Sequence, residues 1–265
     1  MIKSMKKFSL QFYPAKALST VAISGIVLFS SHVGADSNED FNTWKNTLAP
    51  FYLWGVSMSG TMTSGPVTAP LELDFSDAIS ELEATYTVHY EGAKGNFGVI
   101  VDYSFLNLTP SIAASGAPAT LNIDMKNTIS EVAGLYRFGA DKPWQLLAGY
   151  RSYKLDLTIN GLPSPPAPAS QMVIDETIKD VFIGGRYIRD INHKWSVIAR
   201  ADVGTGDSDL VWNALLAFDY RFTKLLSVFA GWRVLVYDVD RGSDADTFKY
   251  DMNHSGPMLA LAFHW

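Results

Sequence analysis

Residues with the chemistry of a nucleophilic enzyme gather near the carboxy-terminal end of the sequence. His254 directly precedes Ser255, and Asp244, Asp246 and Asp251 lie in the same stretch. A serine hydroxyl, a histidine that takes its proton and an acid that orients the histidine are the parts that nucleophilic catalysis needs. Neighbouring residues of a β-strand point to opposite faces, so His254 and Ser255 cannot pair directly in a strand. We therefore expect no catalytic residues and keep an enzyme as an alternative.

Two further groups could carry chemistry. His89 lies two residues from Glu91, on the same face of a strand, and we expect a hydrogen-bonded pair there rather than an acid–base pair. Acidic residues in the late loops have the oxygen ligands that Ca²⁺ or Mg²⁺ prefers, but they show no fixed ligand spacing. The expectation is solvated loop tips, no metal site and no cofactor. These acids are Asp207, Asp209, Asp238, Asp240, Asp244 and Asp246.

A third group is larger, and its members share one face of their predicted strands. Acids and arginines are balanced in it, so the side chains can pair and satisfy one another inside a narrow space. The hypothesis is a packed polar interior, and the alternative is a thin selective pathway lined by the same charges. The group comprises Glu91, Asp102, Glu131, Arg137, Arg151, Asp180, Arg186, Arg200, Asp202, Asp219, Arg221 and Arg233.

The stretch that best shows how such a face is positioned is the last one, 248–265. From Gly256 onward, Pro257, Leu259, Leu261, Phe263 and Trp265 alternate with small or mildly polar residues. A period of two predicts a strand, and a continuous apolar face opposite a tight face is typical of a strand between lipid and a narrow lumen.

The same alternation recurs along the chain and predicts about ten strands, each long enough to cross a membrane at a tilt. Short turns follow the second, fourth, sixth and eighth strands, whereas the other connections are mostly longer, Pro-rich or acidic, as in bacterial barrels with short periplasmic turns. In the first strand, Val56, Met58, Gly60 and Met62 alternate with serines and threonines. The predicted strands are 48–63, 82–94, 97–109, 120–138, 144–160, 171–189, 195–204, 210–222, 225–240 and 248–265.

The predicted fold class is all-β, a transmembrane antiparallel up-and-down β-barrel of about ten strands, with eight or twelve as alternatives. A secreted β-sandwich also has alternating strands, but its strands are usually about half as long. Residues 64–81 are expected to be irregular, with a helical turn near 76–82.

The amino terminus predicts export. Residues 1–16 carry four lysines and no acid, 17–31 are largely apolar, and Val33-Gly34-Ala35 is a small-x-small ending. This is the pattern of a cleaved signal peptide, and the apolar run is short for a membrane anchor. We therefore expect a signal peptide at 1–35, a periplasmic lead-in at 36–46 and the barrel at 47–265.

Composition narrows the class of partner. Hydrophobic residues make up 48% of the chain, which does not exclude a barrel, because only alternate residues face lipid. There is no cysteine, hence no disulfide. Removal of 1–35 takes away four lysines and no acid, which lowers the formal net charge from −6 to −10 and argues against a nucleic-acid partner.

Five segments carry a resemblance to known proteins: Ala49 to Met62, Leu73 to Glu83, Tyr90 to Leu108, Arg200 to Phe222 and Ser255 to Trp265. Together they resemble a group of uncharacterised proteobacterial outer-membrane barrel proteins, small single-barrel porin-type proteins of the OmpA- and OmpW-like kind. The resemblance implies a signal peptide, a single barrel and an outer-membrane location. The last strand also resembles the terminal strand of bacterial barrels, which implies that Phe263 and Trp265 belong to an assembly signal.

Together these observations predict an integral outer-membrane barrel with a charge-paired lumen and a structural or narrow-pore role. The expected partners are outer-membrane lipid, lipopolysaccharide and the barrel-assembly machinery. Two alternatives remain, an enzyme acting on lipid or peptide at the outer rim and a surface receptor or adhesin acting through the outer loops.

Overall fold

The computed structural model describes residues 41–113, 120–139, 142–162 and 170–265. The predicted signal peptide at 1–35 lies outside the described residues, as does the first part of the lead-in. The end of the lead-in already belongs to the barrel, because the first strand begins at Lys45. Within the described ranges, no helix combines the length and the apolarity that a membrane crossing requires.

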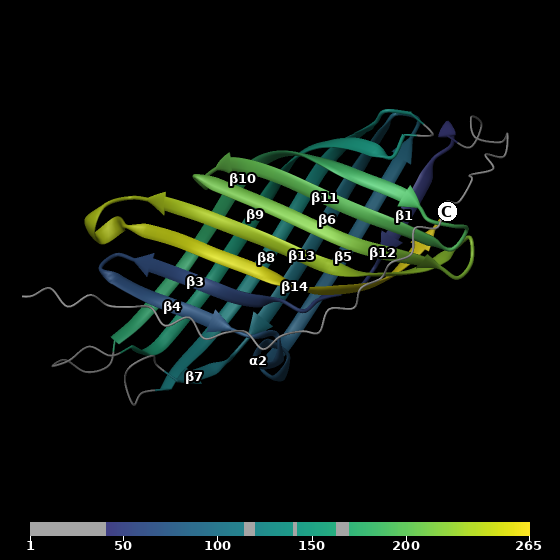
Figure 1. Cartoon of the computed structure of the whole chain (residues 1–265). Coiled ribbons are helices and arrows are strands. Elements are labelled where there is room, and N and C mark those ends of the chain that lie inside the picture. Colours follow the sequence, from purple (N-terminus) through teal and green to yellow (C-terminus); the bar gives the residue numbers. More distant parts are fainter. Residues whose placement is uncertain (1–40, 114–119, 140–141, 163–169) are drawn as a thin grey trace, which may run out of the picture. The chain divides into compact units, whose positions relative to one another are not determined.

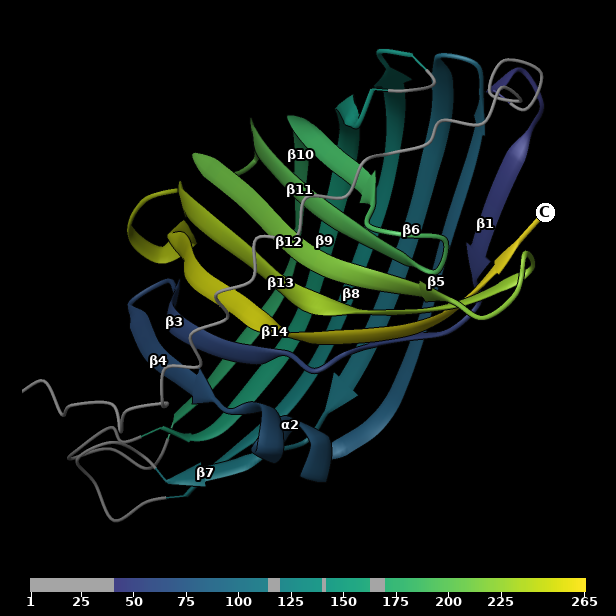
Figure 2. The same cartoon turned by 45° about the vertical axis from the view of Figure 1, so that its right-hand side comes forward.

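The strands form a closed antiparallel barrel with ten strand positions, as predicted (Figures 1 and 2). The ring closes where β14 pairs with β1, at Thr47 opposite His264 and Leu48 opposite Phe263. In order around the ring, the strands are β1 (Lys45–Ala49), β5 (Leu82–Lys94), β6 (Phe97–Leu108), β8 (Thr120–Arg137), β9 (Trp144–Leu162), β10 (Ser170–Asp190), β11 (Trp195–Gly206), β12 (Leu210–Arg221), β13 (Leu226–Arg241) and β14 (Phe248–His264).

The first strand position is interrupted. After β1 come β2 (Tyr52–Trp54) and β3 (Ser57–Ser64), and both pair with β14. Beyond Ala49 the chain leaves β5, and the Thr87 side chain takes over the backbone groups of Tyr52. The Thr87 hydroxyl accepts a hydrogen bond from Tyr52 N at 2.7 Å and donates one to Tyr52 O. A side chain thus satisfies buried backbone groups where strand pairing stops.

Three elements fall in stretches that the sequence pattern left irregular or loop-like. They are β4 (Val67–Leu73), which forms a hairpin with β3, the helix α2 (Phe75–Ser80), and β7 (Ser111–Ala113), which pairs with β8. The helix lies one residue earlier than the expected helical turn. Its first residue, Phe75, donates its backbone N–H to Ser57 Oγ at 3.0 Å, so α2 is fixed against the interrupted first strand.

The connections after the second, fourth, sixth and eighth strand positions are short, as predicted, but the alternation is incomplete, because only residues 207–209 separate β11 from β12. Short turns join β5 to β6, β8 to β9, β10 to β11 and β12 to β13. These turns lie at the same end of the barrel as Lys45, where β1 begins, and Trp265, which follows β14. In the first of these turns Gly95 has a φ of 58°, which favours glycine. The β3–β4 hairpin and the β13–β14 connection, with the 3₁₀ helix η1 (Asp244–Asp246), lie at the opposite end (Figure 1).

In the half of the barrel next to the short turns, which we call the turn half, the exterior is apolar. On β14 the outward face runs through Leu259, Leu261 and Phe263 to Trp265, all exposed, as predicted for a strand in lipid. Neighbouring strands continue this band. Its exposed members include Val132, Tyr136, Trp144, Leu146, Tyr150, Val181, Ile183, Trp195, Leu216, Phe218 and Trp232.

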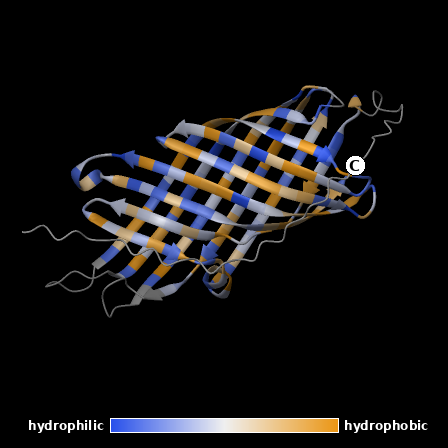
Figure 3. Ribbon diagram, viewed as in Figure 1, coloured by the Kyte–Doolittle hydropathy of each residue, from blue (hydrophilic) through white to orange (hydrophobic). Residues whose placement is uncertain are grey.

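In the other half, which we call the loop half, the polarity is reversed. On β8 the outward residues Asn122, Asp124 and Lys126 are exposed and polar, whereas Ile123 and Met125 are buried. The colours of Figure 3 alternate along the strands in both halves, because the period of two persists while the faces exchange roles. Large apolar residues of β3, β4, β8, β9, β10, β13 and β14 meet in one buried cluster there.

This reversal corrects the simple assignment of each apolar face to lipid. Met58 and Met62 point inward and are almost completely buried, whereas Ser59 and Thr61 lie on the exterior. The alternation of the first strand was correctly recognised. Its apolar face, however, packs against a core instead of lipid, because this part of the strand belongs to the loop half.

We predict that the apolar band is sensitive to charge and the loop half is not. Leu216→Arg should reduce the free energy of unfolding in lipid vesicles by about 2–4 kcal/mol, since it places a cation on the lipid face. Asn160→Arg, on the exterior of the loop half, is the matched control and should leave that free energy nearly unchanged. Equal effects of the two substitutions in urea titrations would contradict this division of the exterior.

Deletion of Phe263–Trp265 should prevent closure of the ring. The deletion removes Phe263 and His264, which pair with Leu48 and Thr47. It also removes Trp265, whose backbone N–H and C=O pair with those of Asn46. Unpaired strand edges cannot be satisfied in lipid, so the truncated chain should lose the heat-modifiable gel mobility of a folded barrel. Phe263→Leu combined with Trp265→Phe keeps the pairing and serves as the control. Normal membrane insertion of the truncated chain would refute the role of this strand end.

Candidate functional site

Four charged side chains from three strands form a closed ring of ion pairs, which we call the floor cluster; Glu131, Arg151 and Asp202 are buried, and Arg200 is half-buried. Arg151 Nη2 lies 2.8 Å from Glu131 Oε2 and 2.8 Å from Asp202 Oδ1. Arg200 completes the ring, 2.7 Å from Glu131 Oε1 as an ion contact outside hydrogen-bond geometry, and 2.8 Å from Asp202 Oδ2. Charges buried this deeply are tolerated only when they are paired.

Neighbouring side chains hold the floor cluster in place. The ring of Phe182 lies below both guanidinium groups, at 4.7 Å from Arg151 Cζ and 5.4 Å from Arg200 Cζ. Asn213 donates to Asp202 Oδ2 at 2.8 Å. The strand register brings these residues together, with Glu131 directly opposite Arg151 and Asp202 opposite Asn213.

On the loop side of the floor cluster, aromatic groups fill the interior. Tyr153 Oη lies 2.7 Å from Tyr250 Oη, and His254 Nε2 lies 3.1 Å from Tyr250 Oη. Tyr153 and Tyr237 stack with ring centroids 5.0 Å apart. Because these side chains are almost completely buried and adjoin the apolar cluster of the loop half, the interior beyond the floor cluster is packed, apart from a small cavity of about 30 Å³ beside Tyr153 and His254.

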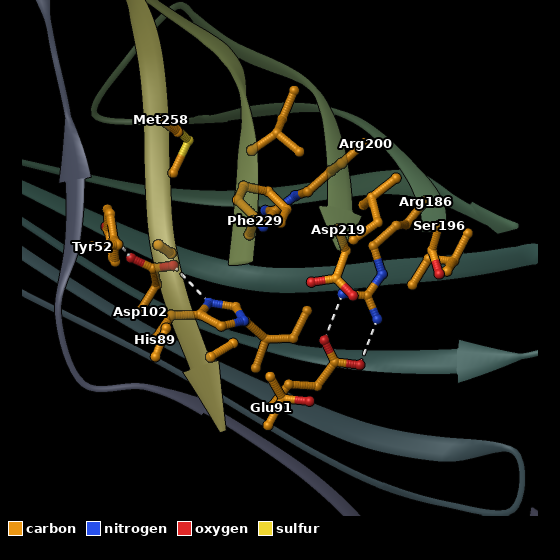
Figure 4. A pocket seen from close by; sticks show the side chains of 18 of the residues that line it. Tyr52, His89, Glu91, Asp102, Arg186, Ser196, Arg200, Asp219, Phe229 and Met258 are labelled. Carbon is orange, nitrogen blue, oxygen red and sulfur yellow. Dashed lines mark hydrogen bonds and ion pairs between the residues drawn. The ribbon is translucent and has the colours of Figure 1, made fainter. Parts of the chain in front are cut away.

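On the turn side of the floor cluster, the interior holds a cavity of about 260 Å³. Its lining runs from Asp190 and Arg221, exposed beside the short turns, to Asn213 and Arg233, which are buried near the floor cluster. The cavity therefore opens at the end of the barrel that carries the short turns. Figure 4 shows its side chains converging from several strands.

One wall of the cavity holds a hydrogen-bonded trio. Asp102 accepts a hydrogen bond from Tyr52 Oη at 2.6 Å through Oδ1, and its Oδ2 lies 2.9 Å from His89 Nδ1 (Figure 4). The trio follows from register, since His89 and Asp102 are directly opposite each other. The predicted pairing of His89 with Glu91 is therefore wrong: both face the interior, but Asp102 is the partner of His89.

Glu91 instead pairs with Arg186. The two groups form a bidentate contact with both N–O distances at 2.6 Å, and Arg186 also donates to Gln145 Oε1 at 2.9 and 2.7 Å. A planar guanidinium bound at two edges has little freedom to move. This pair is thus a fixed part of the cavity wall.

Two buried charged groups of the cavity have no ionic partner. Arg233 donates Nε to Asn213 Oδ1 at 2.9 Å, and its guanidinium lies 4.8 Å from the centre of the Trp54 ring. Asp219 is also buried, and its carboxylate has no hydrogen bond or ion pair with any residue in the described part of the chain. Neither belongs to a charge-paired network.

Three of the predicted lumen charges serve other purposes. Arg137 donates Nε to Gly95 O at 2.7 Å and stacks on Phe41, so it fixes a short turn and the lead-in. Asp180 accepts from the backbone N–H and the hydroxyl of Ser208, at 2.9 and 2.8 Å, and so anchors the β11–β12 loop. Arg221 is exposed at the mouth of the cavity.

The serine and histidine near the carboxy terminus lie on opposite sides of the barrel wall. His254 is buried in the interior, whereas Ser255 Oγ accepts a hydrogen bond from Trp232 Nε1 at 2.9 Å on the exterior. Asp251 also faces outward, and Asp244 and Asp246 are exposed in η1. These residues do not converge at one rim. Within the described ranges, no group of three His, Asp or Glu side chains is arranged to hold a metal ion.

Sequence reasoning missed the uncharged members of the site. Tyr52 and Trp54 lie in the interrupted part of the first strand, and Asn213 and Gln145 carry no charge to attract attention. The sequence did contain a signal for Asn213, because it lies an even number of residues from Asp219 on β12 and its side chain therefore faces the interior as well. For Tyr52 there was none, since its place depends on the break after β1.

We predict that the floor cluster is a major stabilising element of the fold. Arg151→Met leaves Glu131 and Asp202 buried with one cation instead of two, and should reduce the free energy of unfolding by about 3–5 kcal/mol. Lys154→Met is the matched control, because Lys154 forms its ion pairs on the exposed exterior. A urea titration in which both variants unfold like the parent chain would contradict the prediction.

Comparison with solved structures matches the chain to several proteins at low sequence identity. The translocator domain of the autotransporter NalP from Neisseria meningitidis matches with 13% identity, 86% of this chain, 91% of that chain and a TM-score of 0.35. The outer-membrane protease OmpT from Escherichia coli matches with 8% identity, 84% and 95% coverage and a TM-score of 0.46. A Pseudomonas aeruginosa FadL homologue matches with 9% identity, 84% and 89% coverage and a TM-score of 0.31. No protein-family model and no curated protein matches the sequence.

Proposed function

We propose that this chain is an integral outer-membrane barrel that is closed to the passage of solutes and has a structural or binding role. The apolar band of the turn half supports a membrane location. A band of exposed leucine, valine and aromatic side chains is stable only when something apolar covers it. Because the strands alternate, this apolar band is present on all sides of the ring, as a surrounding of lipid requires.

The single observation that carries the closed state is the floor cluster. Glu131, Arg151 and Asp202 are at most 5% exposed, and the filled loop half lies beyond them. A solute entering from the short turns would have to break four ion contacts and then displace an apolar core. This supports the packed-interior hypothesis over the narrow pathway.

A receptor or adhesin is the second candidate, and one observation favours it. β8, β9 and β10 are 18, 19 and 21 residues long, which exceeds the ~9–11 residues that a membrane crossing needs. Their surplus length belongs to the loop half, with a polar exterior and an apolar interior. Such a rigid extension can present loops above a membrane surface.

The remaining expectations stand as part of this proposal. A role without catalysis is supported by the separation of His254 from Ser255. Outer-membrane lipid, lipopolysaccharide and the assembly machinery are the proposed partners, as the apolar band and the closing strand require. Membership in the group of small outer-membrane barrel proteins is supported by the quoted segments, two of which, Ala49 to Met62 and Ser255 to Trp265, face each other where the ring closes.

The closed state predicts no ion conductance. The folded chain, verified by heat-modifiable mobility and added to planar bilayers, should produce no single-channel steps, because the floor cluster and the loop-half core block the lumen. Arg151→Ala should also remain silent, since the apolar core beyond it stays in place. A pore-forming barrel in the same bilayers is the positive control. Regular steps from the parent chain would refute the closed state.

A further inference from the structure

The cavity contains two buried charges of opposite sign that no described residue pairs with directly. Arg233 is 6% exposed and Asp219 is 8% exposed. Both line the same cavity, which opens at the short turns. Elsewhere in the cavity the carboxylates are engaged, Glu91 by Arg186 and Asp102 by His89 and Tyr52. Arg233 and Asp219 therefore differ from Glu91 and Asp102 in having no charged partner in the wall.

Arg233 is held in a way that leaves part of its guanidinium available. Its Nε is engaged by Asn213, and the Trp54 ring lies against the group, whereas the two Nη groups have no hydrogen-bond partner among the described residues. Neither Nη atom is buried without a hydrogen-bond partner, so the unused donors are open to the cavity, and a carboxylate matches the geometry of a guanidinium. This end of the cavity is prepared for a carboxylate.

Asp219 lies nearer the mouth of the cavity. Arg233 is opposite Leu215 on β12, and Asp219 is four residues further along that strand, opposite Phe229. At ~3.3 Å per residue the two backbone positions are about 13 Å apart, and the long arginine side chain covers part of this distance. Its carboxylate oxygens are likewise open to the cavity, and a carboxylate without an ionic partner is suited to an ammonium group.

We propose that the cavity binds a small zwitterion, with its carboxylate on Arg233 and its ammonium group on Asp219. The separation of the two groups fits a solute whose charges are several bonds apart, such as a dipeptide, better than a simple α-amino acid. Such a ligand is neutral overall, so it pairs both buried charges without adding a net charge. The proposal deepens the binding role proposed above and relies on the closed lumen only for entry from the short turns.

Isothermal titration calorimetry on the folded full-length barrel in detergent tests the proposal, with alanyl-alanine as the probe. Saturable binding is expected, and Arg233→Met and Asp219→Asn should each weaken it about tenfold or more, because each removes a charge-assisted contact. Arg189→Met and Asp238→Asn, both on the exterior, are matched controls and should bind like the parent chain.

Two capped probes assign each end of the ligand. N-acetyl-alanyl-alanine lacks the ammonium group, so its weaker binding should be insensitive to Asp219→Asn but still sensitive to Arg233→Met. Alanyl-alanine amide lacks the carboxylate and should show the opposite pattern. If a variant loses heat-modifiable mobility and so fails to fold, the capped probes on the parent chain still decide.

Three results would overturn the proposal. They are no saturable heat with millimolar alanyl-alanine, equally tight binding of the capped probes by the parent chain, and unchanged binding in both variants. The closed barrel is tested separately by conductance. Absence of binding with silent bilayers refutes the zwitterion alone, whereas channel steps refute the closed state whatever the calorimetry gives.

Discussion

In the membrane location proposed above, lipid offers no hydrogen-bonding partner, so every backbone N–H and C=O of the turn half must be satisfied by another part of the chain. β14 meets this requirement for the whole ring. It pairs with β13 along its full length, and on its other edge it pairs successively with β1, β2 and β3. Where the first strand leaves β5, the Thr87 hydroxyl replaces the lost strand contact by binding both backbone groups of Tyr52. The interruption allows the first strand to bend across the barrel, which places Tyr52 and Trp54 in the cavity wall and carries β3 and β4 over the core of the loop half.

The exchange of polarity between the two halves explains where the charges lie. A turn half with lipid outside tolerates polar groups only inside, and a loop half with water outside buries its apolar groups. The floor cluster stands where these two interiors meet. There the side chains are too deep for water and border an apolar core, so only mutual pairing can compensate their lost hydration. Glu131, Arg151 and Asp202 accordingly have direct ionic partners, whereas Arg221, exposed at the mouth, has none among the described residues.

Periodicity alone predicts the ten strand positions and the four short turns, because a period of two depends only on local sequence. It cannot say which face points inward. Met58 and Leu259 are both apolar members of alternating stretches, yet one is buried and the other is exposed. β4 was missed because Pro66 and Pro70 argue against a strand, but Pro70 is tolerated in a strand that pairs with β3 alone. The partner of Glu91 was beyond prediction, since Glu91 and Arg186 are 95 residues apart and meet only through the closed ring.

The twelve inward charges therefore do not act as one network, although they share a face and a near balance of sign. Most of the deeply buried charges have ionic partners. All four members of the floor cluster are paired, and in the cavity wall Glu91 pairs with Arg186 and Asp102 with His89. Arg233 and Asp219 depart from this order, because they are buried and yet have no ionic partner. Arg233 contributes a hydrogen bond to Asn213 and a contact with the Trp54 ring, but neither Arg233 nor Asp219 contributes an ion pair to the packed interior. Their position in a cavity that opens at one end only, together with the fixed pairs around them, makes these two residues the selective element of the interior. The paired charges supply the rigid frame that holds them apart.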